Sequence, residues 1–169
     1  DNKYQHPALY YYSHICYEEK NYETALAGFK LLVSDPTFGS VVPYYITQIY
    51  FLQGKYEAVV KEAPALLKDS AYVQRADDIH RMIGESYFSM KDYSGALPFL
   101  RKIDLGKSAV GNYAIGYCYY KTGDCPNAIK HLEEACATKD TLAQNAAYHM
   151  ADCYVKMGDK LKAKNAYYK

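Results

Sequence analysis

The sequence predicts an all-α fold, an α-solenoid of antiparallel helix pairs. Three observations predict it. A short turn recurs along the chain, an aromatic-rich helical pattern precedes each turn, and a second helical pattern follows it. The turns are separated by 34, 37, 32 and 35 residues when the following residues serve as anchors: Lys20, Gly54, Lys91, Gly123 and Gly158. A near-constant period of this length indicates stacked helix–turn–helix repeats.

The segment around Gly123 shows how each half of the repeat is read. Apolar and aromatic residues recur three and four positions apart over 110–120, which is the spacing of one helix face. Gly123-Asp124 then ends the first helix in a tight turn, and Pro126 suits the first turn of the second helix.

Irregular spacing and two prolines predict local departures from this pattern. The interval of 37 residues predicts a longer first helix in the third repeat, starting near Ser70. Pro64 lies mid-helix, where it should kink or shorten the helix, and Pro98 lies about one turn into its helix.

Composition excludes several classes of function. The 20 basic residues are nearly balanced by 19 acidic ones and are scattered, which disfavours binding to nucleic acid. No apolar run approaches the ~20 residues that span a bilayer, so we expect no membrane insertion. Tyr is abundant, with 21 residues, and Trp is absent. Tyrosine has an apolar body and a polar tip, so it suits half-buried surfaces.

These features together resemble the tetratricopeptide repeat, a helix–turn–helix unit of about 34 residues. The family's small residue in the first helix matches Ser13, Thr47, Gly84, Gly116 and Ala151. Its alanine in the second helix matches Ala25, Ala96, Ala128 and Ala163, with Val59 departing in the second repeat. Small residues at these positions let the two helices of a unit approach closely.

The resemblance implies a right-handed superhelix and one domain over residues 1–169. The expected repeats cover approximately 6–39, 40–76, 77–108, 109–143 and an incomplete 144–169. Such repeats are also typical of bacterial tetratricopeptide proteins. Localisation stays open between the bacterial periplasm or envelope and the cytoplasm, where unpaired cysteines are more common.

Cys118, Cys125 and His131 lie close together in the sequence and raise the alternative of a metal or redox site. The cysteine spacings fit no zinc framework, and the repeat alignment places the cysteines at packing positions. His131 is expected to face outward. Only His149 and Cys153 share the spacing of a two-ligand face, whereas zinc takes three or four ligands. We expect no metal and no cofactor.

No motif of nucleophilic, phosphate-binding or metalloprotease chemistry is present, so we expect no enzymatic activity. In the family, the first helices line the concave face. The residues expected to form a groove there are Tyr10, His14, Tyr44, Gln48, Arg81, Glu85, Tyr113, Tyr117, Tyr148 and Asp152. The next position along each helix holds Tyr17, Phe51, Phe88 and Tyr120, which we expect to pack against the following repeat.

Tyrosine gives a large contact area at small entropic cost, so this groove suits a peptide or a partner helix. It lacks the Lys and Asn residues that clamp a peptide carboxylate in one well-known variant of the family. The sequence therefore predicts a scaffold that binds a protein or peptide. The alternative is a structural spacer in a longer repeat array, with the tyrosines used for packing. We also expect self-association through the C-terminal repeat, which ends without a polar capping helix.

Overall fold

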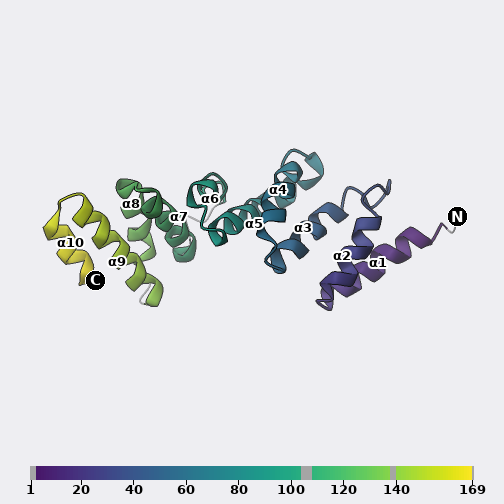
Figure 1. The fold of residues 1–169 in the computed structure, drawn as a ribbon, viewed down its shortest axis with the longest axis horizontal. Helices are drawn as coiled ribbons and strands as arrows, with labels where there is room; N and C mark the ends of the chain where they lie inside the picture. The colour runs from purple at the N-terminus through teal and green to yellow at the C-terminus, as the bar shows by residue number, and fades with distance from the viewer. Residues whose placement is uncertain (1–2, 104–107, 138–139, 169) are drawn as a thin grey trace. The chain divides into compact units, whose positions relative to one another are not determined.

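The computed structural model describes residues 3–103, 108–137 and 140–168. Within these ranges the chain is all-α, as predicted, and the fold is an α-solenoid of helix pairs (Figure 1). The elements are α1 (Gln5–Glu18), α2 (Tyr22–Leu31), α3 (Val42–Leu52), α4 (Tyr56–Leu66), η1 (Ser70–Arg75), α5 (Ala76–Ser89), α6 (Tyr93–Leu100), α7 (Ala109–Thr122), α8 (Cys125–Ala135), α9 (Thr141–Lys156) and α10 (Lys160–Tyr167). No helix within the described ranges has the length and apolar character needed to cross a bilayer.

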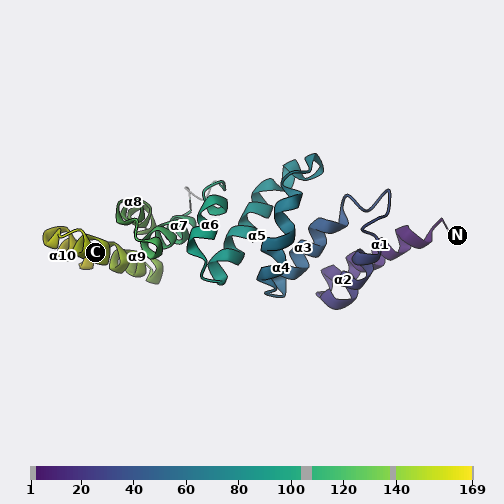
Figure 2. The same ribbon diagram turned by 45° about the horizontal axis from the view of Figure 1, so that its top comes forward.

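The chain divides into two compact units, Asp1–Ser86 (unit 1) and Tyr87–Lys169 (unit 2). Unit 1 contains α1 to α4, η1 and most of α5. Unit 2 contains α6 to α10, and α9 and α10 lie side by side in both views (Figures 1 and 2). The repeat boundaries and the single domain over 1–169 stay predictions, and residues 1–2, 104–107, 138–139 and 169 of that range lie outside the described residues.

The same turn joins the two helices of every pair. Each anchor residue has a positive φ, the left-handed conformation that commonly ends a helix. Three anchors are glycines, which adopt this conformation at no steric cost, whereas Lys20 (φ 62°) and Lys91 (φ 63°) adopt it as non-glycine residues. In four pairs the next residue caps the second helix by accepting a backbone N–H: Asn21, Asp92, Asp124 and Asp159.

The small residues of the first helices lie where the paired helices approach each other. A Cβ atom added to Gly116 would lie 2.8 Å from Cγ of Leu132 and 3.1 Å from its backbone nitrogen. The matching residues Ser13 and Thr47 are buried, and their hydroxyls donate to Leu9 and Pro43 carbonyls one helical turn back. Close helix approach therefore depends on these small residues, as predicted.

The third repeat differs in detail from the prediction. Its extra length does not extend the α-helix from Ser70. Instead, residues Ser70–Arg75 form the 3-10 helix η1, which Asp69 caps by accepting from the N–H of Ala71 at 2.9 Å. Pro64 lies near the end of α4 and is accommodated within the helix.

Candidate functional site

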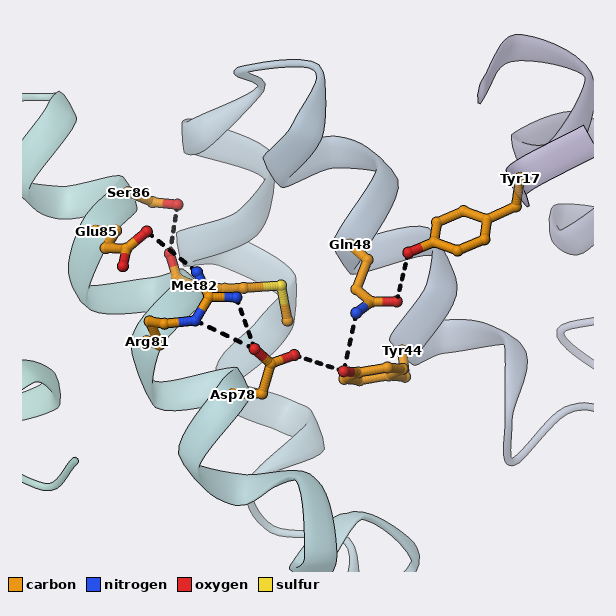
Figure 3. Close-up of polar contacts among 8 residues, drawn as sticks. All are labelled: Tyr17, Tyr44, Gln48, Asp78, Arg81, Met82, Glu85 and Ser86. Atoms are coloured by element: carbon orange, nitrogen blue, oxygen red, sulfur yellow. Dashed lines mark hydrogen bonds and ion pairs between the residues drawn. The ribbon is translucent and has the colours of Figure 1, made fainter. Parts of the chain in front are cut away.

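The first helices of unit 1 share a chain of hydrogen bonds on one face (Figure 3). Tyr17 of α1 donates to Oε1 of Gln48 on α3 at 3.1 Å. Nε2 of Gln48 donates to the Tyr44 hydroxyl at 2.9 Å, and Tyr44 donates to Asp78 of α5 at 2.5 Å. Asp78 also accepts from Arg81 at 2.6 Å. The network therefore connects three consecutive first helices.

The surroundings of the network favour an ionised Asp78 and a neutral Tyr44. Burial alone would raise the pKa of Asp78, but hydrogen bonds from Tyr44 and Arg81 outweigh it and lower the pKa. Burial and the bond to Asp78 together raise the pKa of Tyr44. Arg81 also pairs with Glu85 at 3.3 Å, and Arg75 from η1 lies over the Tyr44 ring, 4.2 Å from its centroid.

The remaining predicted residues of unit 1 belong to an aromatic cluster at α1. Tyr10 stacks on Phe38 with ring centroids 4.5 Å apart. His14 contacts the edge of Tyr45 at 5.3 Å and lies 4.0 Å from Glu18. Both side chains keep part of their surface exposed.

The first helices of unit 2 carry an aromatic cluster instead of a hydrogen-bond chain. Tyr113 and Tyr117 of α7 stack with centroids 5.8 Å apart. His149 of α9 packs against this pair, 5.0 Å from Tyr117, and lies 4.6 Å from Tyr120. Burial, followed by the charge of Lys121, lowers the pKa of His149. Its Nδ1 atom is buried, and no hydrogen-bond partner for it lies within the described residues.

Charged and exposed groups border this aromatic cluster. Asp152 pairs with Lys156 at 2.7 Å, and a hydrogen bond from Lys156, together with one from Tyr120, lowers the pKa of Asp152. The Lys156 ammonium lies 4.5 Å from the centroid of Tyr120. Tyr148 is 57% exposed and contacts the edge of His149. The cluster thus presents tyrosine faces beside a lysine and a carboxylate.

Within each unit, the structure brings most of the predicted groove residues into a shared cluster. Tyr44 is only 5% exposed, because Asp78 and Arg75 cover its side chain. It therefore supports the surface but offers no ring face to a ligand. The sequence reasoning missed the central places of Asp78, Arg75 and His149. The repeat alignment could have found Asp78, which lies one turn before Arg81 on the same helix face.

Tyr17, Phe88 and Tyr120 pack toward the following repeat, as predicted. Tyr17 lies 5.5 Å from Tyr45, Phe88 lies 5.8 Å from Tyr117, and Tyr120 contacts His149. These contacts show that part of the tyrosine stripe serves packing.

The cysteines behave as packing residues, as predicted. Four are buried, and Cys136 is half-buried with its thiol 3.7 Å from the Ala143 carbonyl. Burial raises the pKa of Cys118 to about 12, which disfavours the thiolate. Among the described residues, no group of three or more His, Cys, Asp or Glu side chains is placed to hold a metal ion.

The expectation that His131 faces outward is wrong. Its ring stacks on Tyr119 with centroids 5.8 Å apart, and its Nδ1 lies 3.0 Å from Oδ1 of the buried Asn112. Burial lowers the pKa of His131. The histidine therefore connects α8 to α7 instead of facing solvent.

The helix pairs, their period and their left-handed turns define a helical-repeat protein of the α-solenoid class. Residues 145–169 match the family model for the tetratricopeptide repeat. The matched segment covers 25 of the 169 residues and comprises most of α9 and all of α10. No curated protein matches the chain.

Solved structures share this fold at low sequence identity. One is YrrB, described as a tetratricopeptide-repeat protein with an unusual peptide-binding site; it is 17% identical, with a TM-score of 0.76 over 98% of this chain and 84% of YrrB. MamA of strain AMB-1 is 15% identical, with a TM-score of 0.79 over 99% and 90% of the two chains. MamA of Desulfovibrio magneticus RS-1 is 18% identical, with a TM-score of 0.70 over 96% and 91%.

Proposed function

We propose that the chain binds an extended peptide or a partner helix on the first-helix faces of its repeats. The carrying observation is that both units hold tyrosine and charged side chains in fixed, partly exposed positions. In unit 1 these are Tyr10, His14, Gln48, Arg81 and Glu85, supported by Tyr44. In unit 2 they are Tyr113, Tyr117, Tyr148 and Asp152. Side chains that are already held by stacking or hydrogen bonds lose little entropy when a ligand binds.

The face of each unit, taken by itself, suits different chemical groups of a ligand. The Arg81–Glu85 pair in unit 1 offers charged donors and acceptors to a peptide backbone or to polar side chains. Tyr148 in unit 2 offers an exposed ring beside Asp152, which suits an apolar or cationic side chain. The peptide-binding site described for YrrB, which has the same fold, supports a peptide ligand.

Peptides selected from a random library against the chain would test this function. We expect the double substitution Tyr148→Ala with Asp152→Ala to weaken the selected peptides by roughly tenfold or more, because aromatic anchors dominate such interfaces. Tyr168→Ala is the matched control, since Tyr168 is a more exposed tyrosine that follows the end of α10, outside this face. Affinity measured by calorimetry should fall only in the double variant. Equal affinities, with unchanged melting temperatures, would contradict the proposal.

A second role as an assembly segment, with no peptide ligand of its own, is favoured by one observation. A cavity of about 500 Å³ lies at the outer face of α9 and α10, lined by Val155, Lys160, Ala163, Lys164, Tyr167 and Tyr168. Apolar surface of this kind is typical of a protein contact. Self-association through this C-terminal repeat belongs to that second role.

A further inference from the structure

One position of the second helices decides what covers a tyrosine of the first helices. Tyr87, Tyr119 and Tyr154 are equivalent residues, each four positions before its turn anchor. The Phe99 ring stacks on Tyr87 and the His131 ring stacks on Tyr119, with centroids 5.8 Å apart in each pair. Phe99 and His131 are themselves equivalent, each eight positions after the anchor. In two consecutive repeats, this position therefore supplies a ring that covers the tyrosine.

In the pair of α9 and α10, Ala166 occupies this position and has no ring to place on Tyr154. A cavity of about 310 Å³ lies there instead. Its lining residues come from α8, α9 and α10: Glu133, Met150, Tyr154, Lys162, Asn165 and Ala166. Met150 and Ala166 are almost fully buried and give the cavity an apolar floor. The residues of α8 and α10 at its rim are exposed and polar.

The cavity lies on another side of α9 than the predicted groove. Met150 and Tyr154 follow the groove residues Tyr148 and Asp152 by two positions, which is a rotation of about 200° around the helix. The cavity opens between the second helices α8 and α10. It is therefore a separate site from the first-helix face of unit 2.

The cavity is open because of the residue at position 166, and not because of the place of α10 in the chain. Leu132 of α8 shares a core cluster with Met150 of α9, so its position is one that meets the following repeat. The equivalent of Leu132 on α10 is Tyr167, and the cavity is lined by other residues of that helix. The walls of the cavity are thus complete within α8, α9 and α10.

The lining of the cavity favours a neutral aromatic ring over a cation. The Lys162 ammonium already lies 5.8 Å from the centroid of the Tyr154 ring, so it would repel a second cation there. A neutral ring can stack on Tyr154 as Phe99 stacks on Tyr87. At the rim, the Glu133 carboxylate can accept a hydrogen bond from a hydroxyl or an indole N–H at the edge of that ring.

The polar group that holds the His131 ring is replaced by an apolar residue beside the cavity. Nδ1 of His131 lies 3.0 Å from Oδ1 of Asn112, and the equivalent of Asn112 on α9 is Ala147. A histidine in the cavity would therefore lack this contact. The side chains that fit best are phenylalanine, which needs no polar partner, and tyrosine or tryptophan, which carry their polar atom at the ring edge.

We propose that this cavity accepts one aromatic side chain of a partner protein, which stacks on Tyr154 in the place that Phe99 and His131 hold in the preceding repeats. The cavity lies at the low end of the volumes of small-molecule sites, so it encloses about one ring and leaves the rest of its ligand in solvent. That suits a single residue projecting from a larger partner, and buried aromatic anchors contribute most of the affinity of many protein contacts. This inference concerns a different face from the proposed peptide-binding faces and does not depend on them.

Short peptides with one variable residue test the proposal by nuclear magnetic resonance. Titration of the peptide Gly-Gly-Trp-Gly-Gly into the isotope-labelled chain should shift the amide signals of Tyr154, Lys162 and Ala166. The dissociation constant should be roughly 1 mM, because a single side chain supplies the contact. The same peptide with leucine or lysine in place of tryptophan should bind roughly tenfold more weakly or less, because neither side chain can stack on Tyr154 as a ring does.

Filling the cavity from within the chain gives the matched variants. Ala166→Phe copies Phe99, so it should raise the melting temperature by roughly a few degrees and abolish binding of the tryptophan peptide. Ala166→His copies His131 and serves as a second filling variant. Leu161→Phe is the control: Leu161 is 70% exposed on α10, away from the cavity lining, so this variant should bind the peptide like the unmodified chain.

Several results would overturn the proposal. One is a leucine or lysine peptide that binds as tightly as the tryptophan peptide. Another is the absence of shifts at the cavity in the unmodified chain up to roughly 10 mM peptide, ten times the expected dissociation constant. A third is unchanged binding by a filling variant that circular dichroism shows to be folded. The chain with Tyr148→Ala and Asp152→Ala should still bind the tryptophan peptide at the cavity, which separates this test from that of the proposed function.

Discussion

The first-helix faces of the two units are held together by different kinds of side-chain contact. In unit 1, a polar chain from Tyr17 to Arg81 connects three helices through hydrogen bonds. In unit 2, stacked rings of Tyr113 and Tyr117 pack against His149. A polar network depends on every partner being present, whereas an aromatic cluster is held by area and shape. Substitutions should therefore act differently on the two units.

The largest effect is expected from a substitution that disturbs the steric packing between the two helices of a pair. Gly116→Val should destabilise unit 2 by about 2 to 3 kcal/mol, because the added atoms overlap Leu132 and its backbone. Thr47→Val, at the equivalent position of unit 1, should cost about 1 kcal/mol or less, since it changes shape little and loses one hydroxyl contact. Urea unfolding monitored by circular dichroism measures both. Equal effects would mean that close helix approach is not the limiting feature of unit 2.

Removing a carboxylate should cost more stability in the hydrogen-bond network of unit 1 than beside the aromatic cluster of unit 2. Asp78→Ala leaves Tyr44 and Arg81 without their shared acceptor and should cost about 2 kcal/mol. Asp152→Ala removes a surface pair with Lys156 and should cost about 0.5 kcal/mol or less. Hydrogen exchange, read separately for α3 and α9, would assign each loss to its unit. Similar losses in both would contradict the contrast drawn between the units.

The turns are expected to respond alike, because both units use the same left-handed geometry. Lys20→Gly in unit 1 and Lys91→Gly in unit 2 should each stabilise the chain by about 0.5 to 1 kcal/mol, as glycine removes the strain of a positive φ at some cost in unfolded-chain entropy. Thermal unfolding of the two single variants gives the comparison. A loss of stability in either would show that the lysine side chain makes a compensating contact.

The smallest effect is expected from a change of pH, and the two units should lose stability in different pH ranges. Burial lowers the pKa values of His149 and His131, so the unfolded chain binds more protons than the folded chain. Unit 2 should therefore lose stability as the pH falls below the ordinary histidine pKa of about 6.5. The lowered pKa of Asp78 makes unit 1 lose stability only below the ordinary aspartate pKa of about 3.9. A His149→Leu chain, melted at pH 7 and at pH 5.5, should show a smaller loss than the unmodified chain.

The sequence was sufficient to predict the helix pairs, because the turns impose a strict local requirement. A left-handed residue ends the first helix of each pair, and in four pairs a capping side chain follows it, so the turns can be recognised in the sequence. Gly116 likewise indicates the close helix contact. Alignment also placed the groove residues on shared faces. It could not predict that Asp78 would cover Tyr44, because a periodic pattern gives the face of a residue and not its rotamer or partner. His131 was misjudged for the same reason: its hydrogen bond to Asn112 depends on tertiary contact.

The extra length of the third repeat bears on how repeats of one fold can come to differ in their surfaces. The interval between Gly54 and Lys91 is longer than the other intervals, and residues Ser70–Arg75 within it form η1 between α4 and α5. Arg75, the last residue of η1, lies over Tyr44. A loop between modules can therefore vary in length and composition while the modules stay intact, and it can still place a side chain on their shared surface. Linker residues are thus a route by which repeats of one architecture could acquire individual recognition properties.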